Sequence, residues 1–92
     1  MIEASRFLPY VLCQLERIKV GQGIVIWPLK KDREVRVYKL SNQIFTVEED
    51  GFERCVFENL DQKELKKVLK LMQKREFPRS HQLWVKIVQE KL

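Results

Sequence analysis

Residues 24–57 read IVIWPLKKDREVRVYKLSNQIFTVEEDGFERCVF, and this stretch decides the fold. It holds four runs rich in Val, Ile, Phe and Tyr, which favour β-strands; these runs are residues 24–29, 35–40, 44–48 and 52–57. Polar segments typical of turns separate them, and Asp50-Gly51 suits a two-residue type I′ turn because both positions need a positive φ. Such short links predict a four-stranded antiparallel meander.

A helix is expected before the meander. From Phe7 to about Ile18 the apolar residues recur at spacings of three and four, which places them on one face of a helix. Ser5 is the expected N-cap, and Pro9 falls in the first turn, where its missing N–H costs little. Gly21 and Gly23 are expected to end this helix.

A second helix is expected after the meander. Asp61 is followed three residues later by Glu64, which is the signature of a capping box at a helix start. The helix is predicted over residues 62–75, and Phe77-Pro78 stops it.

The tail, residues 80–91, fits two patterns. Leu83, Val85 and Ile87 alternate as in a strand, whereas a helical face is also formed by Leu83, Trp84, Ile87, Val88 and Leu92. We favour a helix capped by Ser80, with a fifth strand as the alternative. The expected fold class is therefore α+β, with an N-terminal helix, a four-stranded antiparallel meander and one or two C-terminal helices packed on one sheet face. No repeat or linker divides residues 1–92, so a single domain is expected.

The positive charge of the chain is concentrated in its last third. Residues 1–59 hold nine basic and nine acidic side chains, whereas residues 60–92 hold nine basic and four acidic ones, which accounts for the whole net charge of +5. A local positive potential of this kind favours polyanions.

The expected location is the cytoplasm. Cys13 and Cys55 are the only cysteines and are interpreted as buried free thiols in a reducing compartment. The apolar run near the N-terminus is too short to span a bilayer and lacks the pattern of a signal peptide, so no membrane association is expected.

The strongest candidate binding surface is a row of lysines on the second predicted helix. They fall within an arc of about 100°, opposite the apolar face, and we call them the lysine stripe: Lys63, Lys66, Lys67, Lys70 and Lys74. Like charges four residues apart repel, and only Glu64 offsets them locally. This pattern suits a polyanionic partner, but it also suits a solvated face or one paired with the acids near Asp50.

Four further residues complete the candidate nucleic-acid interface. Arg75 lies at the end of the same helix, and Arg79 is the expected clamp on a phosphate, with help from Ser80 and His81. The favoured alternative for residues 75–82 is a plain interhelical loop with a helix cap. Arg36 and Tyr38 share one face of a predicted strand, where the ring could stack on a base.

Catalytic and metal chemistry have no comparable support. His81 is the only histidine, and no nucleophile motif or metal-ligand spacing occurs. No catalytic residue, metal, cofactor or small-molecule substrate is therefore expected, and the protein is predicted not to be an enzyme.

The sequence favours a small basic accessory protein that binds RNA or DNA phosphates through a lysine-rich helix. The alternative is a protein-interaction or assembly module, a homodimer or a partner-binding protein, with no nucleic-acid role. Its basis is the apolar run at residues 24–29, which reads as a strand covered on both faces and could require a second subunit for that cover. The plain alternative is a central core strand, although Pro28 points to an edge or a strand end.

Overall fold

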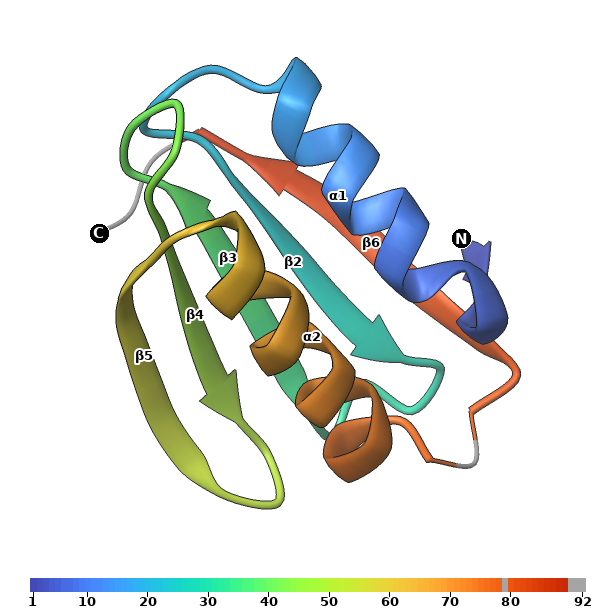
Figure 1. The fold of residues 1–92 in the computed structure, drawn as a ribbon. Coiled ribbons are helices and arrows are strands. Elements are labelled where there is room, and N and C mark those ends of the chain that lie inside the picture. Colours follow the sequence, from blue (N-terminus) through green and yellow to red (C-terminus); the bar gives the residue numbers. More distant parts are fainter. Residues whose placement is uncertain (79, 90–92) are drawn as a thin grey trace.

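The computed structural model describes residues 1–78 and 80–89. It shows a six-stranded antiparallel sheet with two helices across one face (Figure 1). The elements in chain order are β1 (Ile2–Glu3), a 3₁₀ turn (Ala4–Arg6), α1 (Phe7–Arg17), β2 (Gly23–Pro28), β3 (Glu34–Lys39), β4 (Phe45–Asp50), β5 (Arg54–Leu60), α2 (Gln62–Glu76) and β6 (Gln82–Val88). The α+β class is confirmed, and the four strands of the expected meander are consecutive neighbours, β2 to β5.

The tail forms a strand, so the preferred helix was wrong. β6 lies between β1 and β2 and gives the sheet six strands in the order β1-β6-β2-β3-β4-β5. Its side chains alternate as the strand alternative predicted: Leu83 and Val85 face the helices, while Trp84 and Lys86 face the other way. Ser80 therefore caps no helix, and within residues 1–78 and 80–89 α2 is the one helix that follows the meander and packs on the sheet.

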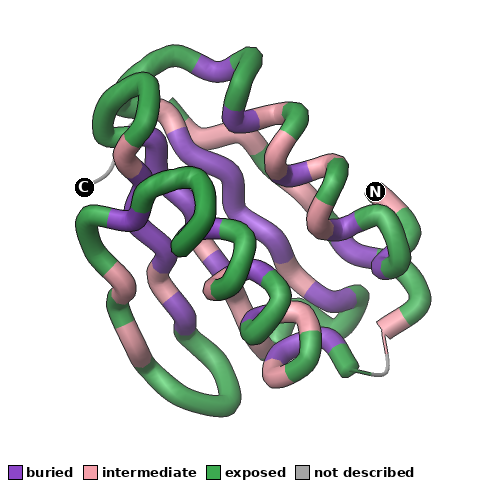
Figure 2. The backbone as a smooth tube through the Cα atoms, in the orientation of Figure 1, coloured by how far each residue is buried: buried purple, intermediate pink, exposed green. Residues whose placement is uncertain are grey.

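The core lies between the sheet and the two helices. Each helix buries one side and exposes the other, and Figure 2 shows exposed residues along the outer surface of both. Leu65, Leu69 and Met72 of α2 are fully buried. Phe7 of α1 packs against Phe77, which follows α2, with ring centroids 5.6 Å apart. One cluster thus joins the chain from Ala4 to Leu83.

The sheet face away from the helices, which we call the open face, is covered by its own side chains. Val25 in β2 is buried there, and Tyr38 in β3 lies across Gly23, where a Cβ would be only 2.5 Å from the ring. β2 is therefore a central strand covered within one chain, with Pro28 as its last residue. The interpretation of this run as a central core strand is therefore confirmed, and the cover of β2 needs no second subunit.

The ends of α1 and the β4–β5 hairpin differ from the predictions, whereas the start of α2 agrees with them. Ser5 lies in the 3₁₀ turn and makes no cap, and Gly23 belongs to β2 instead of ending α1. The hairpin between β4 and β5 pairs Asp50 with Arg54, so its loop has three residues and not two. The expected capping box is confirmed, since Asp61 accepts from the Glu64 amide at 2.8 Å and Glu64 accepts from the Asp61 amide at 3.3 Å.

Within residues 1–78 and 80–89, no helix combines the length and the apolar character needed to cross a bilayer.

A buried lysine ends α1. Lys39, the last residue of β3, donates from Nζ to the carbonyls of Leu15 at 2.7 Å and Ile18 at 3.1 Å. Its backbone also bonds the loop, because its amide donates to Gln22 and its carbonyl accepts from Gly21. The ammonium group thus satisfies carbonyls that the helix leaves unpaired and opposes the negative end of its dipole.

We predict that Lys39→Met destabilises the protein by about 2 kcal/mol, because two buried carbonyls lose a charged donor. Urea unfolding of the variant and the native protein measures this difference. Lys19→Met is the matched control, since Lys19 is exposed in the nearby loop and its loss is expected to change stability by less than about 0.5 kcal/mol. Equal stability of the two variants would contradict the role given to Lys39.

Candidate functional site

The five residues of the lysine stripe all lie on the exposed side of α2. Their placement follows from the amphipathic pattern, because the opposite side of the helix is buried in the core. In the described residues, no ion pair joins any of these ammonium groups to an acid.

The acids near the β4–β5 hairpin pair with arginines instead. Glu48 faces Arg36 at 3.9 Å, Asp50 faces Arg54 at 3.3 Å, and Glu53 faces Arg75 at 3.3 Å. The idea that these acids answer the lysine stripe within the same molecule is therefore not supported by the ion pairs of the described residues.

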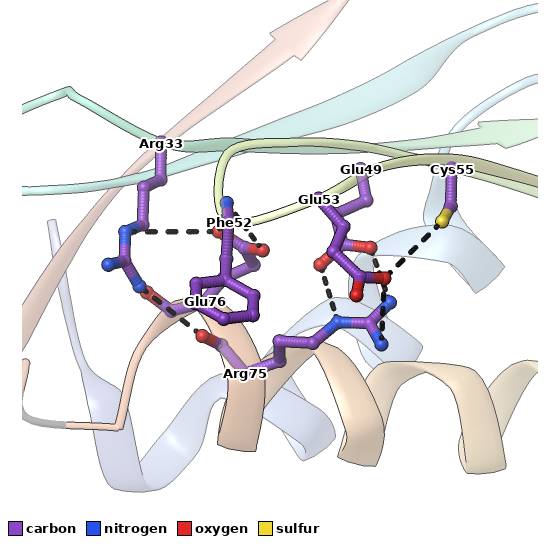
Figure 3. Close-up of polar contacts among 7 residues, drawn as sticks. All are labelled: Arg33, Glu49, Phe52, Glu53, Cys55, Arg75 and Glu76. Atoms are coloured by element: carbon purple, nitrogen blue, oxygen red, sulfur yellow. Dashed lines mark hydrogen bonds and ion pairs between the residues drawn. The ribbon is translucent and has the colours of Figure 1, made fainter.

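Arg75 does not belong to the lysine stripe. Its side chain turns toward the sheet and meets Glu49 of β4 in a two-point contact (Figure 3). Nε donates to Oε2 at 2.8 Å and Nη2 donates to Oε1 at 2.5 Å, while the Glu49 side chain has no solvent exposure. The hydrogen bond to Glu49 raises the pKa of Arg75 above its ordinary value. This arginine anchors α2 to β4 and is not presented to a phosphate.

Glu76, the next residue, is also buried. Its two carboxyl oxygens each accept from the Phe52 amide at 3.0 Å, and the Arg33 guanidinium lies 4.0 Å from Oε1. Arg33 further donates to the carbonyls of Arg75 and Glu76, at 3.3 Å each, which ends α2. A Cβ on Gly51 would lie 2.1 Å from Glu76 Oε1, so the hairpin needs glycine for this close approach.

Glu49 and Glu76 share a hydrogen bond, and their pKa values shift in opposite directions. Burial raises the pKa of Glu76, and its hydrogen bond to Glu49 raises it further. For Glu49, burial opposes ionisation, but the hydrogen bonds from Arg75 and Glu76 outweigh it and lower the pKa. The pKa of Glu76 is thus raised and that of Glu49 lowered, and the two carboxyls lie where α2 meets the hairpin.

Arg36 and Tyr38 lie on the open face, on the other side of the sheet from α2. Arg36 pairs with Glu34 and Glu48, and Tyr38 is only 6% exposed. The expectation of an exposed stacking ring at Tyr38 was therefore wrong. The structure does not bring these two residues together with the lysine stripe.

The loop after α2 does not have the expected phosphate-binding geometry. Arg79 lies outside the described residues. Ser80 and His81 precede a strand, so no helix N-terminus supplies free amides there. They border an open hollow of about 510 Å³ together with Lys30 and Arg33, but the α2 carbonyls already occupy Arg33.

The cysteines are both free, but Cys13 is exposed and Cys55 half-buried, so neither is the buried thiol expected. Cys55 lies with Glu49 and Glu53 so that their donor atoms fall within 4.8 Å of one another. Arg75 already binds both carboxylates of this group. Burial and the two neighbouring acids raise the pKa of the Cys55 thiol, which disfavours the thiolate that a metal needs. The group is better described as the surroundings of an arginine than as a metal site.

Two tryptophans that the expected interface did not include dominate the open face. Trp27 of β2 is directly opposite Trp84 of β6, and the Lys31 ammonium lies 5.7 Å and 5.2 Å from their ring centroids. The Trp27 indole donates to Glu34 at 2.8 Å. This pair depends on β6 being a strand, so it could have been foreseen only from the strand alternative for the tail.

No family model, no curated protein and no solved structure matches the chain, so function has to be inferred from its own residues and their geometry.

The buried carboxyl pair predicts a specific pH dependence. Because the pKa of Glu76 is raised in the folded state, the native protein holds this proton more tightly than the unfolded chain. The free energy of unfolding therefore falls as pH rises from the ordinary value of 4.5 toward the folded pKa of Glu76. For Glu49 the sign is opposite, and its stabilisation is lost as pH falls from 4.5 toward its lowered pKa.

We predict that Glu76→Gln removes the loss of stability on the alkaline side, because an amide donates to Glu49 and accepts from Phe52 without ionising. Urea unfolding at a series of pH values measures this change in slope. Glu16→Gln is the control, since Glu16 is exposed on α1. The same slope above pH 4.5 in native protein and Glu76→Gln would show that Glu76 carries no raised pKa.

Proposed function

We propose that the protein binds the phosphate backbone of RNA or DNA through the lysine stripe on α2, as an accessory factor without base specificity. The observation that carries the proposal is a row of five exposed ammonium groups with no acid paired to them among the described residues. Lysines of this kind act as point charges on phosphates.

The distribution of charge supports this role. The chain has eighteen basic and thirteen acidic side chains, so its net charge of +5 equals the number of lysines in the stripe. The rest of the molecule is balanced, and the arginines that pair with the hairpin acids neutralise the groups that would otherwise repel a polyanion. The positive potential is therefore concentrated on one side of the molecule.

The length of the stripe also fits. From Lys63 to Lys74 the helix rises about 16 Å, at about 1.5 Å per residue. One strand of a duplex carries a phosphate charge about every 3.4 Å, so this length faces about five of them. Five lysines thus match the charge density of one strand.

A membrane surface is a poorer partner. A helix that lies in a bilayer interface needs an apolar face to insert, but Leu65, Leu69 and Met72 are fully buried against the sheet. The proposal places the binding in the cytoplasm, as the sequence predicted, and the two free thiols agree with a reducing compartment.

Arg75, Arg36 and Tyr38 have no part in the proposed interface, because ion pairs or burial occupy them elsewhere. Five contacts from lysines alone predict a log-log dependence of affinity on salt with a slope of about 3 to 5, at about 0.7 to 0.9 per phosphate. Fluorescence anisotropy with short labelled single- and double-stranded DNA and RNA, repeated across a salt series, measures this slope.

We predict that Lys67→Glu, Lys70→Glu and Lys74→Glu together abolish binding at moderate salt. All three side chains are exposed, so the fold is expected to survive. The matched control makes the same change of net charge at three exposed lysines outside α2: Lys19, Lys30 and Lys86. It is expected to keep the salt slope of the native protein. Equal loss of binding in both triple variants, or no binding by the native protein at low salt, would overturn the proposal.

A further inference from the structure

β5 forms an outer edge of the sheet (Figure 1). In the described part of the chain it pairs only with β4, so its other side presents backbone amides and carbonyls without a strand partner. Such an edge is a template for a further strand. The chemistry of its side chains indicates which strand it suits.

The regular part of β5 is short and centred near Val56. Arg54 to Phe57 pair in register with Asp50 to Val47, and a register irregularity follows between Val47 and Phe45. Asn59, beyond this part, has a φ of 55° and departs from extended geometry. A partner strand can therefore lie flat only along residues near Val56.

Two exposed residues of this segment, and a third directly after it, carry the side chains that a partner strand would meet. Val56 is opposite Glu48 of β4, so it shares the face on which Glu48 meets Arg36, and Arg54 and Glu58 lie two residues to either side of it. Val56 is 56% exposed, and the Arg54 side chain is 87% exposed. Glu58 is exposed and forms no ion pair with a described residue. Along the edge, a basic residue, an apolar residue and an acidic residue therefore follow one another: Arg54, Val56 and Glu58.

This order is complementary to itself in the antiparallel direction. We propose that β5 pairs with β5 of a second copy of this chain about a two-fold axis at Val56, joining two sheets into one. Val56 then lies opposite its own counterpart, and Arg54 lies opposite Glu58 of the other copy, twice. This inference is independent of polyanion binding by α2.

The contact requires no existing ion pair to break. Arg54 already meets Asp50 at 3.3 Å on the β4 side, and the second copy adds Glu58 on the other side. Arg54 then lies between two acids, and Glu58 gains its first cationic partner among the described residues. Exposed Val56 side chains pack together between these two charge pairs.

Neighbouring registers lack this match. Moving the two-fold axis to Cys55 places Val56 opposite Arg54, and moving it to Phe57 places Val56 opposite Glu58. The other end of the sheet is also less suitable, because β1 pairs with the start of β6 at Gln82 and Leu83. A pair centred on Lys86, the middle of the remaining segment, would bring two ammonium groups together.

Charge reversal tests the register. Arg54→Glu alone places two acids opposite each other at positions 54 and 58 of the two copies, and Glu58→Arg alone places two basic residues there. Each variant is therefore expected to weaken the dimer roughly tenfold or more. An equal mixture of the two variants restores both opposite pairs and is expected to form a heterodimer. Analytical ultracentrifugation across concentrations measures native protein, each variant and the mixture, and circular dichroism confirms that each variant is folded.

The native protein is expected to dimerise, each single variant to be largely monomeric, and the mixture to dimerise again. A native protein that stays monomeric at its highest soluble concentration overturns the proposal. Single variants that dimerise as well as the native protein, or a mixture that stays monomeric, also overturn it.

Cysteine crosslinking provides a second test. Residues directly opposite in an antiparallel pair have Cα atoms about 4.5 to 5.5 Å apart, which a disulfide can bridge. Val56→Cys in a Cys13→Ser, Cys55→Ser background is expected to give a covalent dimer on mild oxidation. Val20→Cys in the same background is the matched control, because Val20 is 53% exposed in a loop. Crosslinking of both variants alike, or of neither, would contradict pairing at Val56.

Discussion

The insertion of β6 between β1 and β2 is the constraint on which the rest of the structure depends. After β5 the chain stands at one edge of the sheet, and it must cross to the other side of β2 before the last strand can pair. α2 lies on the helix face over β3, β4 and β5 (Figure 1), and β6 follows it in the chain. The apolar side of α2 is buried against the sheet, so its polar side faces away from the sheet.

Three arginines support the fold, whereas the lysine stripe lies on the surface. The guanidinium groups of Arg33, Arg36 and Arg75 bind carboxylates or helix carbonyls, for which a planar fork with several donors is well suited. The ammonium groups of the lysine stripe remain exposed on α2. Lys39 is the exception, because its buried ammonium closes the end of α1. The excess positive charge consequently lies on the exposed side of α2, where the lysines form no ion pair with a described residue.

The sequence predicted features that depend on local chemistry. The capping box of Asp61 and Glu64, the strands of the meander and the outward face of α2 all follow from spacing and composition. The tail was ambiguous because its apolar residues fit both the helical and the strand period. It forms a strand because the edge of β2 is open to pairing on that side. Arg75 was misplaced for a related reason, since its partner Glu49 is distant in sequence and neither side chain reveals the other. Burial of Tyr38 likewise depends on Gly23 in the neighbouring strand.

The two tryptophans make one joint of the sheet visible to spectroscopy. Trp27 and Trp84 are the only tryptophans in the chain, and they are cross-strand neighbours where β6 meets β2. Lys31 adds a positive charge near both rings. Intrinsic fluorescence therefore reports mainly on the docking of the last strand, whereas far-ultraviolet circular dichroism reports on α1 and α2. Comparing the two signals during refolding distinguishes a chain that folds all at once from one that adds its final strand last.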